Sequence, residues 1–293
     1  MPADFLIFDR ALQRRRLARA LAAGPAEFLL RRAADEAIER LGAVKRHFRM
    51  VADIGTPLPD LAQRLAQANR TVVRLAPLLA TAGPAKLLRA VGDEELLPLK
   101  PGAFDLAVSA LALQNANDLP GALAQIRRAL RPDGLFLGCL IGGKSLDELR
   151  GALAAAEIEI AGGTSPRVAP FADVRDLGAL LQRAGFSLPV ADVETLTVRY
   201  PHLFALLADL RGMGATNSLI ERLRRPTRRR IFLRAAEIYA REHADPDGRL
   251  RATFELIFLS GWAPHASQQR PLRPGSAQRR LADALGAKER KPG

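Results

Sequence analysis

The 293-residue sequence contains one cysteine, Cys139, only four histidines and no long apolar segment. A single cysteine excludes an internal disulfide, and the few histidines leave no basis for a cysteine-rich zinc site, so we expect no bound metal. The longest apolar run, residues 135–143, is nine residues long, about half of the roughly 18–20 needed to cross a bilayer. The sequence therefore predicts no transmembrane segment and a reducing location, the bacterial cytoplasm.

Lysine is also scarce, so the formal net charge of +13 comes mainly from arginine. The charge is +5 over residues 1–50, −1 over 51–200 and +9 over 201–293. The densest basic run, residues 222–230, has no interleaved aromatic residue, which leaves nucleic-acid bases without a stacking platform. We therefore expect no sequence-specific nucleic-acid binding. Arg224 and Arg225 are candidates for contact with an acidic protein partner or an anionic membrane surface, and a solvated helix start is the simpler interpretation.

The first 24 residues are rich in arginine and alanine, as organellar targeting peptides are. Asp4 and Asp9 depart from that pattern, because targeting peptides are poor in acidic residues. The spacing of Phe5, Phe8 and Leu12 instead predicts a short helix that packs on the body of the protein. We expect no targeting signal in this segment.

Strand-like and helix-like segments alternate between residues 49 and 142, a pattern typical of βαβ units. Strands are predicted at 50–55, 71–75, 86–91, 104–109, 135–141, 195–200 and 253–262, and helices at 61–68, 119–130 and 174–184. We divide the chain into a helical extension (1–48), a core (49–200), a helical insertion (201–252), a last strand with a C-terminal segment (253–285) and a disordered tail (286–293).

Three motifs in order, at residues 92–99, 104–109 and 130–134, resemble the class I S-adenosylmethionine-dependent methyltransferase family. This resemblance implies an α/β Rossmann-like fold of three layers, with a mostly parallel seven-stranded sheet and the insertion before the last strand. Further segments resemble one branch of the family: residues 7–12, 117–123, 185–186, 212–217 and 261–269. That branch includes an assembly factor of respiratory complex I that hydroxylates an arginine on a complex I subunit. The malonyl-carrier-protein methyltransferase of biotin synthesis is a more distant relative.

The resemblance implies an S-adenosylmethionine site beyond the carboxyl ends of the strands. Its candidate residues are Asp53, Gly55, Thr56, Asp93, Glu94 and Ser109. The glycine-rich loop is reduced to residues 55–59 (GTPLP), where two prolines replace glycines and donate no N–H. Arg74 or Leu75 stands where the family has a ribose-binding acid, and a guanidinium accepts no hydrogen bond. Asp93 keeps the adenine-binding position, with capping of a turn as an equally good role. We expect weak or lost cofactor binding.

Candidate catalytic residues follow the fourth predicted strand, where relatives carry His-Trp and this chain has Gln114 and Asn115. Glutamine is no base, but its amide can orient a substrate carbonyl or guanidinium. Acid or base chemistry would then fall to Asp118, for which capping of the next helix is the simpler role. The branch signature adds candidate contacts to substrate or partner at Trp262, His265, Gln268 and Gln269. A surface loop that pins the C-terminal tail is the alternative for this segment.

Three functional hypotheses follow from the sequence. The first is an enzyme-family protein that acts on a protein substrate, a respiratory complex I subunit, and binds S-adenosylmethionine weakly. The second is a catalytically inactive scaffold or chaperone with the same fold. The third is a methyltransferase for a carrier protein or a small molecule.

Overall fold

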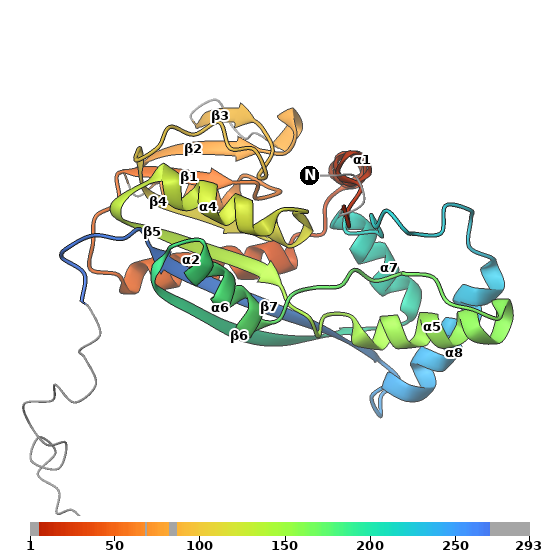
Figure 1. Cartoon of the computed structure of the whole chain (residues 1–293). Helices are drawn as coiled ribbons and strands as arrows, with labels where there is room; N and C mark the ends of the chain where they lie inside the picture. The colour runs from red at the N-terminus through yellow and green to blue at the C-terminus, as the bar shows by residue number, and fades with distance from the viewer. Residues whose placement is uncertain (1–5, 68, 82–86, 270–293) are drawn as a thin grey trace, which may run out of the picture.

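The computed structural model describes residues 6–67, 69–81 and 87–269, and a single twisted sheet runs through it with helices on both faces (Figure 1). The strands are β1 (Met50–Ile54), β2 (Thr71–Ala76), β3 (Leu88–Val91), β4 (Phe104–Ala110), β5 (Leu130–Ile141), β6 (Ser187–Tyr200) and β7 (Leu250–Trp262). Their order across the sheet is β3-β2-β1-β4-β5-β7-β6. Only β7 runs antiparallel to its neighbours in this sheet.

The predicted fold class is confirmed, and the central pairing is the expected one, with Val51 opposite Leu106 in a parallel register. Three strands start earlier than predicted: β5 at Leu130, β6 at Ser187 and β7 at Leu250. The added length of β6 and β7 comes from their antiparallel pairing along almost the whole of both strands. Strand β6 lies at the edge of the sheet and its residues alternate between more and less exposed positions. Because polar residues occupy many of these positions, the prediction covered only the last part of the strand.

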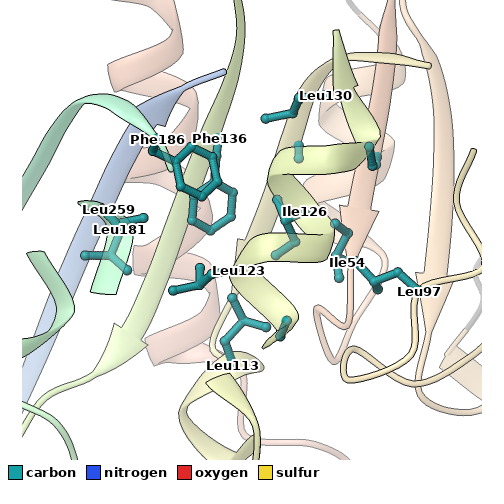
Figure 2. Close-up of a cluster of buried hydrophobic side chains, with 14 of the residues drawn as sticks. Ile54, Leu97, Leu113, Leu123, Ile126, Leu130, Phe136, Leu181, Phe186 and Leu259 are labelled. Atoms are coloured by element: carbon teal, nitrogen blue, oxygen red, sulfur yellow. The ribbon is translucent and has the colours of Figure 1, made fainter. Parts of the chain in front are cut away.

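The helices that cover the core sheet are α2 (Phe28–Ala43), α3 (Asp60–Gln67), α4 (Leu119–Ala129) and α6 (Val174–Arg183). Helices α4 and α6 pack on one face, where Leu123, Ile126 and Leu181 meet Phe136 and Leu259 of the sheet (Figure 2). Helices α2 and α3 pack on the other face around a second buried cluster. The carboxyl ends of β1, β2 and β4 are left for loops, and the candidate site forms there.

A third buried cluster lies beside the sheet and involves α5 (Asp147–Ala161), α7 (Leu203–Gly212) and α8 (Arg229–His243). These helices pack on the ends of β6 and β7 that extend past the rest of the sheet (Figure 1). Residues 201–252 thus contain two helices, and α8 is tied to β7 where the Tyr239 hydroxyl donates to the carbonyl of Arg251 at 2.8 Å.

The N-terminal segment is fastened to the insertion, far away in the sequence. Phe8 forms an isolated bridge with Leu219, and the amide of Asp9 donates to the carbonyl of Ser218 at 2.8 Å. Helix α1 (Arg10–Ala23) therefore lies beside α7 (Figure 1). The division into five segments stays a prediction, and its tail, residues 286–293, lies outside the described residues. Within the described ranges, no helix combines the length and the apolar character needed to span a bilayer.

Candidate functional site

The loop that follows β1 is closed by a buried ion pair between neighbouring strands. Arg74 on β2 lies directly opposite Asp53 on β1, and its guanidinium Nη1 donates to the carboxylate of Asp53. Its Nη2 donates to the carbonyl of Thr56 at 2.6 Å. Both charged side chains are 0% exposed. Burial raises the pKa of the Asp53 carboxyl, while the guanidinium of Arg74 and the hydroxyl of Thr56 act in the opposite direction.

Two other residues predicted to bind the cofactor, Thr56 and Ser109, form hydrogen bonds within the protein interior. The Thr56 hydroxyl donates to Asp53 and accepts from the amide of Ala110 at 3.1 Å. The Ser109 hydroxyl donates to the carbonyl of Ile54 at 2.8 Å. Asp53, Thr56 and Ser109 are therefore bonded to protein groups and buried, and they hold the ends of β1, β2 and β4 together.

The two carboxylates after β3 are bound by arginines of α1. Arg10 contacts both Glu94 and Asp93, the latter at 3.1 Å, and Arg14 also pairs with Asp93. Burial is the strongest influence on the pKa of Asp93 and raises it, but the amide of Glu95 and the two arginines together leave this pKa below its usual value. Asp93 also accepts from the amide of Glu95 at 3.0 Å, so it caps the turn as well.

Arg10, Arg14 and Glu94 line a cavity of about 50 Å³, which we call the cofactor cavity. Its lining includes Arg10, Gly55, Pro57, Glu94 and Ala112. Gly55 has φ +72°, and a Cβ at this position would lie 3.0 Å from the Cβ of Ala112 and 3.6 Å from the Glu94 carboxylate. Glu94 Oε2 is buried and accepts no hydrogen bond within the described part of the chain. The cavity thus retains one free acceptor for a ligand.

Gln114 lies at the junction of two larger cavities next to the cofactor cavity. It follows β4 in a short 3-10 turn, and its Nε2 donates to the carbonyl of Leu111 at 2.9 Å. Gln13 and Asn115 line both the cofactor cavity and one of these neighbours, so the spaces adjoin. Gln114 is accordingly placed where a substrate group could reach it.

Asp118 takes the simpler of its two roles, because its Oδ1 accepts from the amide of Gly121 at 2.8 Å and caps α4. Its neighbour Asn117 was missed as a site residue by sequence reasoning. Asn117 Oδ1 accepts from the amides of Ile7 and Phe8, both at 2.8 Å, and so fastens the N-terminal segment above the site. The shared branch motifs at 7–12 and 117–123 were the available signal, since the two segments meet here.

The predicted substrate or partner residues do not form one group. Trp262 is paired with Leu135 at the amino end of β5, whereas Cys139 of β5 pairs with Ala110 at the carboxyl end of β4. Four residues of strand separate these positions, roughly 13 Å at 3.3 Å per residue. His265 and Gln269 are exposed in the segment after β7. Trp262 packs on Phe48 and under Arg46.

Gln268 supports the alternative interpretation of that segment, because its Nε2 donates to Asp133 at 3.0 Å and to the carbonyl of Ala263 at 2.8 Å. It holds the chain after β7 at the amino ends of the parallel strands, away from the cofactor cavity. Arg224 and Arg225 are exposed before α8 and make no ion pair in the described part of the chain. Their contact with a partner stays a prediction. No cluster of three or more metal-ligating side chains is found in the same part.

Comparison with known proteins identifies the family. Residues 53–138 match the family model described as a methyltransferase domain. The mitochondrial arginine-hydroxylase NDUFAF5 of Danio rerio is 36% identical over 291 residues, covering 94% of this chain and 89% of that protein. The human protein of the same name is 38% identical over 287 residues, covering 94% and 82%. This chain belongs to the NDUFAF5-like branch of the S-adenosylmethionine-dependent methyltransferase superfamily.

The wider superfamily is represented by the malonyl-[acyl-carrier protein] O-methyltransferase of Halorhodospira halophila, which is 34% identical and covers 92% of this chain and 93% of that protein. Among solved structures, the YcgJ protein of Bacillus subtilis matches with a TM-score of 0.55 at 13% identity, covering 80% of this chain and all of that one. At that identity the match shows the fold alone. The resemblance drawn from the motifs is thus confirmed.

One expectation is contradicted by these relatives. The sequence alone led us to expect a bacterial cytoplasmic protein, but the NDUFAF5 relatives from Danio rerio, Homo sapiens and Mus musculus are all named as mitochondrial. Cysteine content and the lack of an apolar run report on redox conditions and on membrane crossing, and neither distinguishes the cytoplasm from another reducing compartment.

The methyltransferase-domain match supports S-adenosylmethionine as the cofactor of this fold. The residues of this NDUFAF5-like chain fit that cofactor only at one end. Glu94 offers a free buried acceptor beside Gly55, which suits an amino or hydroxyl donor. At the ribose position the side chain is the buried cation Arg74, and Pro57 removes an amide from the loop lining. Because the ribose and methionine ends do not fit, we derive no methyl-transfer step.

Proposed function

We propose that this chain serves in the assembly of respiratory complex I by binding a protein, and that S-adenosylmethionine binding is weak and dispensable for this role. The assignment to complex I rests on the NDUFAF5-like branch. The protein-binding role rests on one observation: arginines of the chain itself, Arg10, Arg14 and Arg74, engage the carboxylates that remain in the cofactor site. These internal ion pairs stabilise the fold, and they leave few carboxylate groups available to a ligand.

The expected cofactor affinity follows from the groups that are missing. A charged hydrogen-bond pair contributes about 1.5–3 kcal/mol, and the lost loop amides should cost a comparable amount. A micromolar site corresponds to about −8 kcal/mol, so these losses lead to an affinity of roughly millimolar or weaker.

A second candidate function is catalysis on a protein substrate, and Glu94 favours it. Its Oε2 is a buried acceptor with no partner among the described residues, beside a glycine that leaves room. If α1 moved away, Asp93 and Glu94 would both be available to a cofactor. Opening of this kind would make cofactor binding depend on Arg10 and Arg14.

The first experiment is a calorimetric titration of S-adenosylmethionine into three forms of the full chain. We expect millimolar or weaker binding by the native chain and by Arg15→Ala, a control on the exposed side of α1. The double variant Arg10→Ala, Arg14→Ala should bind several-fold more tightly, because the two carboxylates lose their competing cations. Micromolar binding by the native chain would favour the second candidate.

The second experiment asks whether the biological role needs the site. In cells that lack the gene, complex I assembly on native gels should be restored by the native chain and equally by Glu94→Gln, which removes the carboxylate whose Oε2 could accept from a cofactor. Thermal unfolding of the purified variant confirms that it folds. Failure of a folded Glu94→Gln chain to restore assembly would contradict a role by binding alone.

A further inference from the structure

Two adjoining cavities next to the cofactor cavity form one connected space, which we call the apolar chamber. Their cavity volumes are about 130 and 280 Å³, and together they are comparable to the smallest of the roughly 300–1000 Å³ pockets that bind small ligands. The two share Gln114, Ile141, Leu146, Phe171, Leu210 and Ala215. Most of the remaining lining of the first cavity is leucine, proline, alanine and phenylalanine, so this half of the chamber offers an apolar surface. The second cavity adds leucines and also polar side chains such as Thr216 and Arg211.

Among the described residues that line the chamber, one buried side-chain atom lacks a hydrogen-bond partner. Gln114 Oε1 is buried and accepts no hydrogen bond from the described residues. The orientation of this amide is set by its other end, because Nε2 donates to the carbonyl of Leu111. A buried acceptor left unpaired is costly, so a molecule in the chamber that carries a hydroxyl or amide donor would be held at this point.

The outer end of the chamber opens beside three arginines. Arg16, Arg19 and Arg211 line a cavity of about 190 Å³ together with Thr216, and both Arg211 and Thr216 also line the chamber. Arg16 Nη1 donates to the carbonyl of Asn217. None of the three arginines forms an ion pair with a carboxylate in the described part of the chain, whereas Arg10, Arg14 and Arg222 nearby do.

No ion pair therefore balances the positive charge of these three arginines. Burial lowers the pKa of Arg16, and so do the nearby cations Arg222 and Arg19, while Asp9 acts in the opposite direction. None of the described residues that line the chamber is acidic, so a cationic side chain would find no counter-ion there. An anion at the opening would relieve the repulsion.

We propose that the apolar chamber binds an anionic amphiphile, with its chain against the leucine-rich lining, its head group at Arg16, Arg19 and Arg211, and any donor along the chain at Gln114. A fatty carboxylate has this chemistry, and so does the acyl chain and phosphate of a lipid. This inference does not rest on the proposed function, because it concerns a different cavity and an assembly role could hold without it.

The test uses dodecanoate below its micelle concentration, titrated into the full chain by calorimetry. We expect one saturable site, no binding of acetate, and binding of dodecyl maltoside at least tenfold weaker, because its head carries no charge. The double variant Arg19→Gln, Arg211→Gln should bind dodecanoate about tenfold to a hundredfold more weakly. The matched control Arg224→Gln, Arg225→Gln removes two exposed arginines outside the chamber and should not change the affinity.

A second variant tests the chain-binding part. Ala215 is exposed yet lines both halves of the chamber, so Ala215→Phe should block it without disturbing the core, and dodecanoate binding should fall by at least tenfold. Thermal unfolding checks that each variant folds. The proposal is overturned by the absence of saturable binding to the native chain, or by equal binding to the Arg19→Gln, Arg211→Gln variant.

Vesicles separate the two sources of the ligand chemistry. With phosphatidylglycerol vesicles, a lipid drawn from the bilayer into the chamber should bind less well to Ala215→Phe than to the native chain. Vesicle binding that is unaffected by Ala215→Phe, without binding of monomeric dodecanoate, would mean attraction of surface arginines to the membrane, and would overturn the chamber assignment.

Discussion

The guanidinium of Arg74 donates to the carboxylate of Asp53 from the directly paired position on the next strand, and both side chains are completely buried. In relatives of the methyltransferase superfamily the position of Arg74 is expected to hold an acid. An acid here would place two carboxylates side by side on neighbouring strands. The arginine instead forms an internal ion pair that joins β1 to β2.

Removal of either partner should destabilise the chain strongly. Arg74→Met leaves the Asp53 carboxylate buried without its cation, and Asp53→Leu leaves the guanidinium, each expected to cost about 3–5 kcal/mol of unfolding free energy. The loss of unfolding free energy in the double variant should be smaller than the sum of the two single losses by about 0.5–3 kcal/mol. Urea unfolding measures this. Arg131→Met, which removes a half-exposed pair with Asp105, is the control and should cost under about 1 kcal/mol. Strict additivity would contradict the coupling.

The contact between α1 and the insertion depends on a glycine. Gly214 has φ +71°, and a Cβ there would lie 2.9 Å from the Cα of Leu17. Gly248 has a similar φ of +81° but nothing within 4 Å. Both glycines should suffer from substitution by alanine through backbone strain, but Gly214→Ala should cost about 1–3 kcal/mol more, because the backbone of α1 must move. Equal losses in thermal unfolding would show that α1 adjusts freely.

The N-terminal segment should become accessible when Asn117 is changed. Asn117→Ala removes the acceptor of the Ile7 and Phe8 amides, and also a donor to the carbonyl of Phe8 at 3.2 Å. Trypsin should then cleave at the arginines of α1 at least several-fold faster. The neighbouring variant Asn115→Ala is the control, since its side chain makes no hydrogen bond to the described residues. Unchanged cleavage would mean that the bridge to Leu219 is sufficient.

The unfolding free energy should depend on pH through Glu157, a buried carboxylate of α5. Glu157 accepts from Ser165 and from Arg167, whose Nη1 also donates to Thr227 at 2.6 Å. Burial is the largest single influence and raises the pKa of Glu157. Arg167 and Ser165 lower this pKa by more in total, so it ends below its usual value. A carboxyl with a lowered pKa stabilises the fold above its unfolded pKa of about 4.3, and this contribution is lost as the pH falls through the lowered value.

The difference in unfolding free energy between the native chain and Glu157→Gln should therefore be largest near pH 7 and shrink as the pH falls below about 5. Glu159→Gln, on the same helix but paired with Arg234 at the surface, is the control and should show a much smaller change with pH. A constant difference for Glu157→Gln between pH 7 and pH 3 would exclude an ionised Glu157 as the cause.

Local patterns in the sequence were enough for the sheet and for one helix cap. The strands at 50–54 and 104–110 are apolar runs bounded by turn residues, and Asp118 precedes α4 at the spacing of an N-cap. Such features depend on residues a few positions apart, so they can be recognised without the fold. The expectation of a broken cofactor loop has the same local basis, because Pro57 and Pro59 lack an amide N–H whatever surrounds them, and it stays a prediction.

The tertiary structure decided where the distant side chains went. No local pattern in the sequence shows that Arg74 pairs with Asp53, or that Arg10 reaches Glu94, which lies 84 positions later in the chain. Nor does any local pattern show that Trp262 lies at the end of the strands opposite to the cofactor cavity. The convergence of Arg16 and Arg19 with Arg211 is of the same kind. A charged side chain has many partners available in one sequence, and strand register and helix packing select among them, because burial makes an unpaired charge too costly to keep.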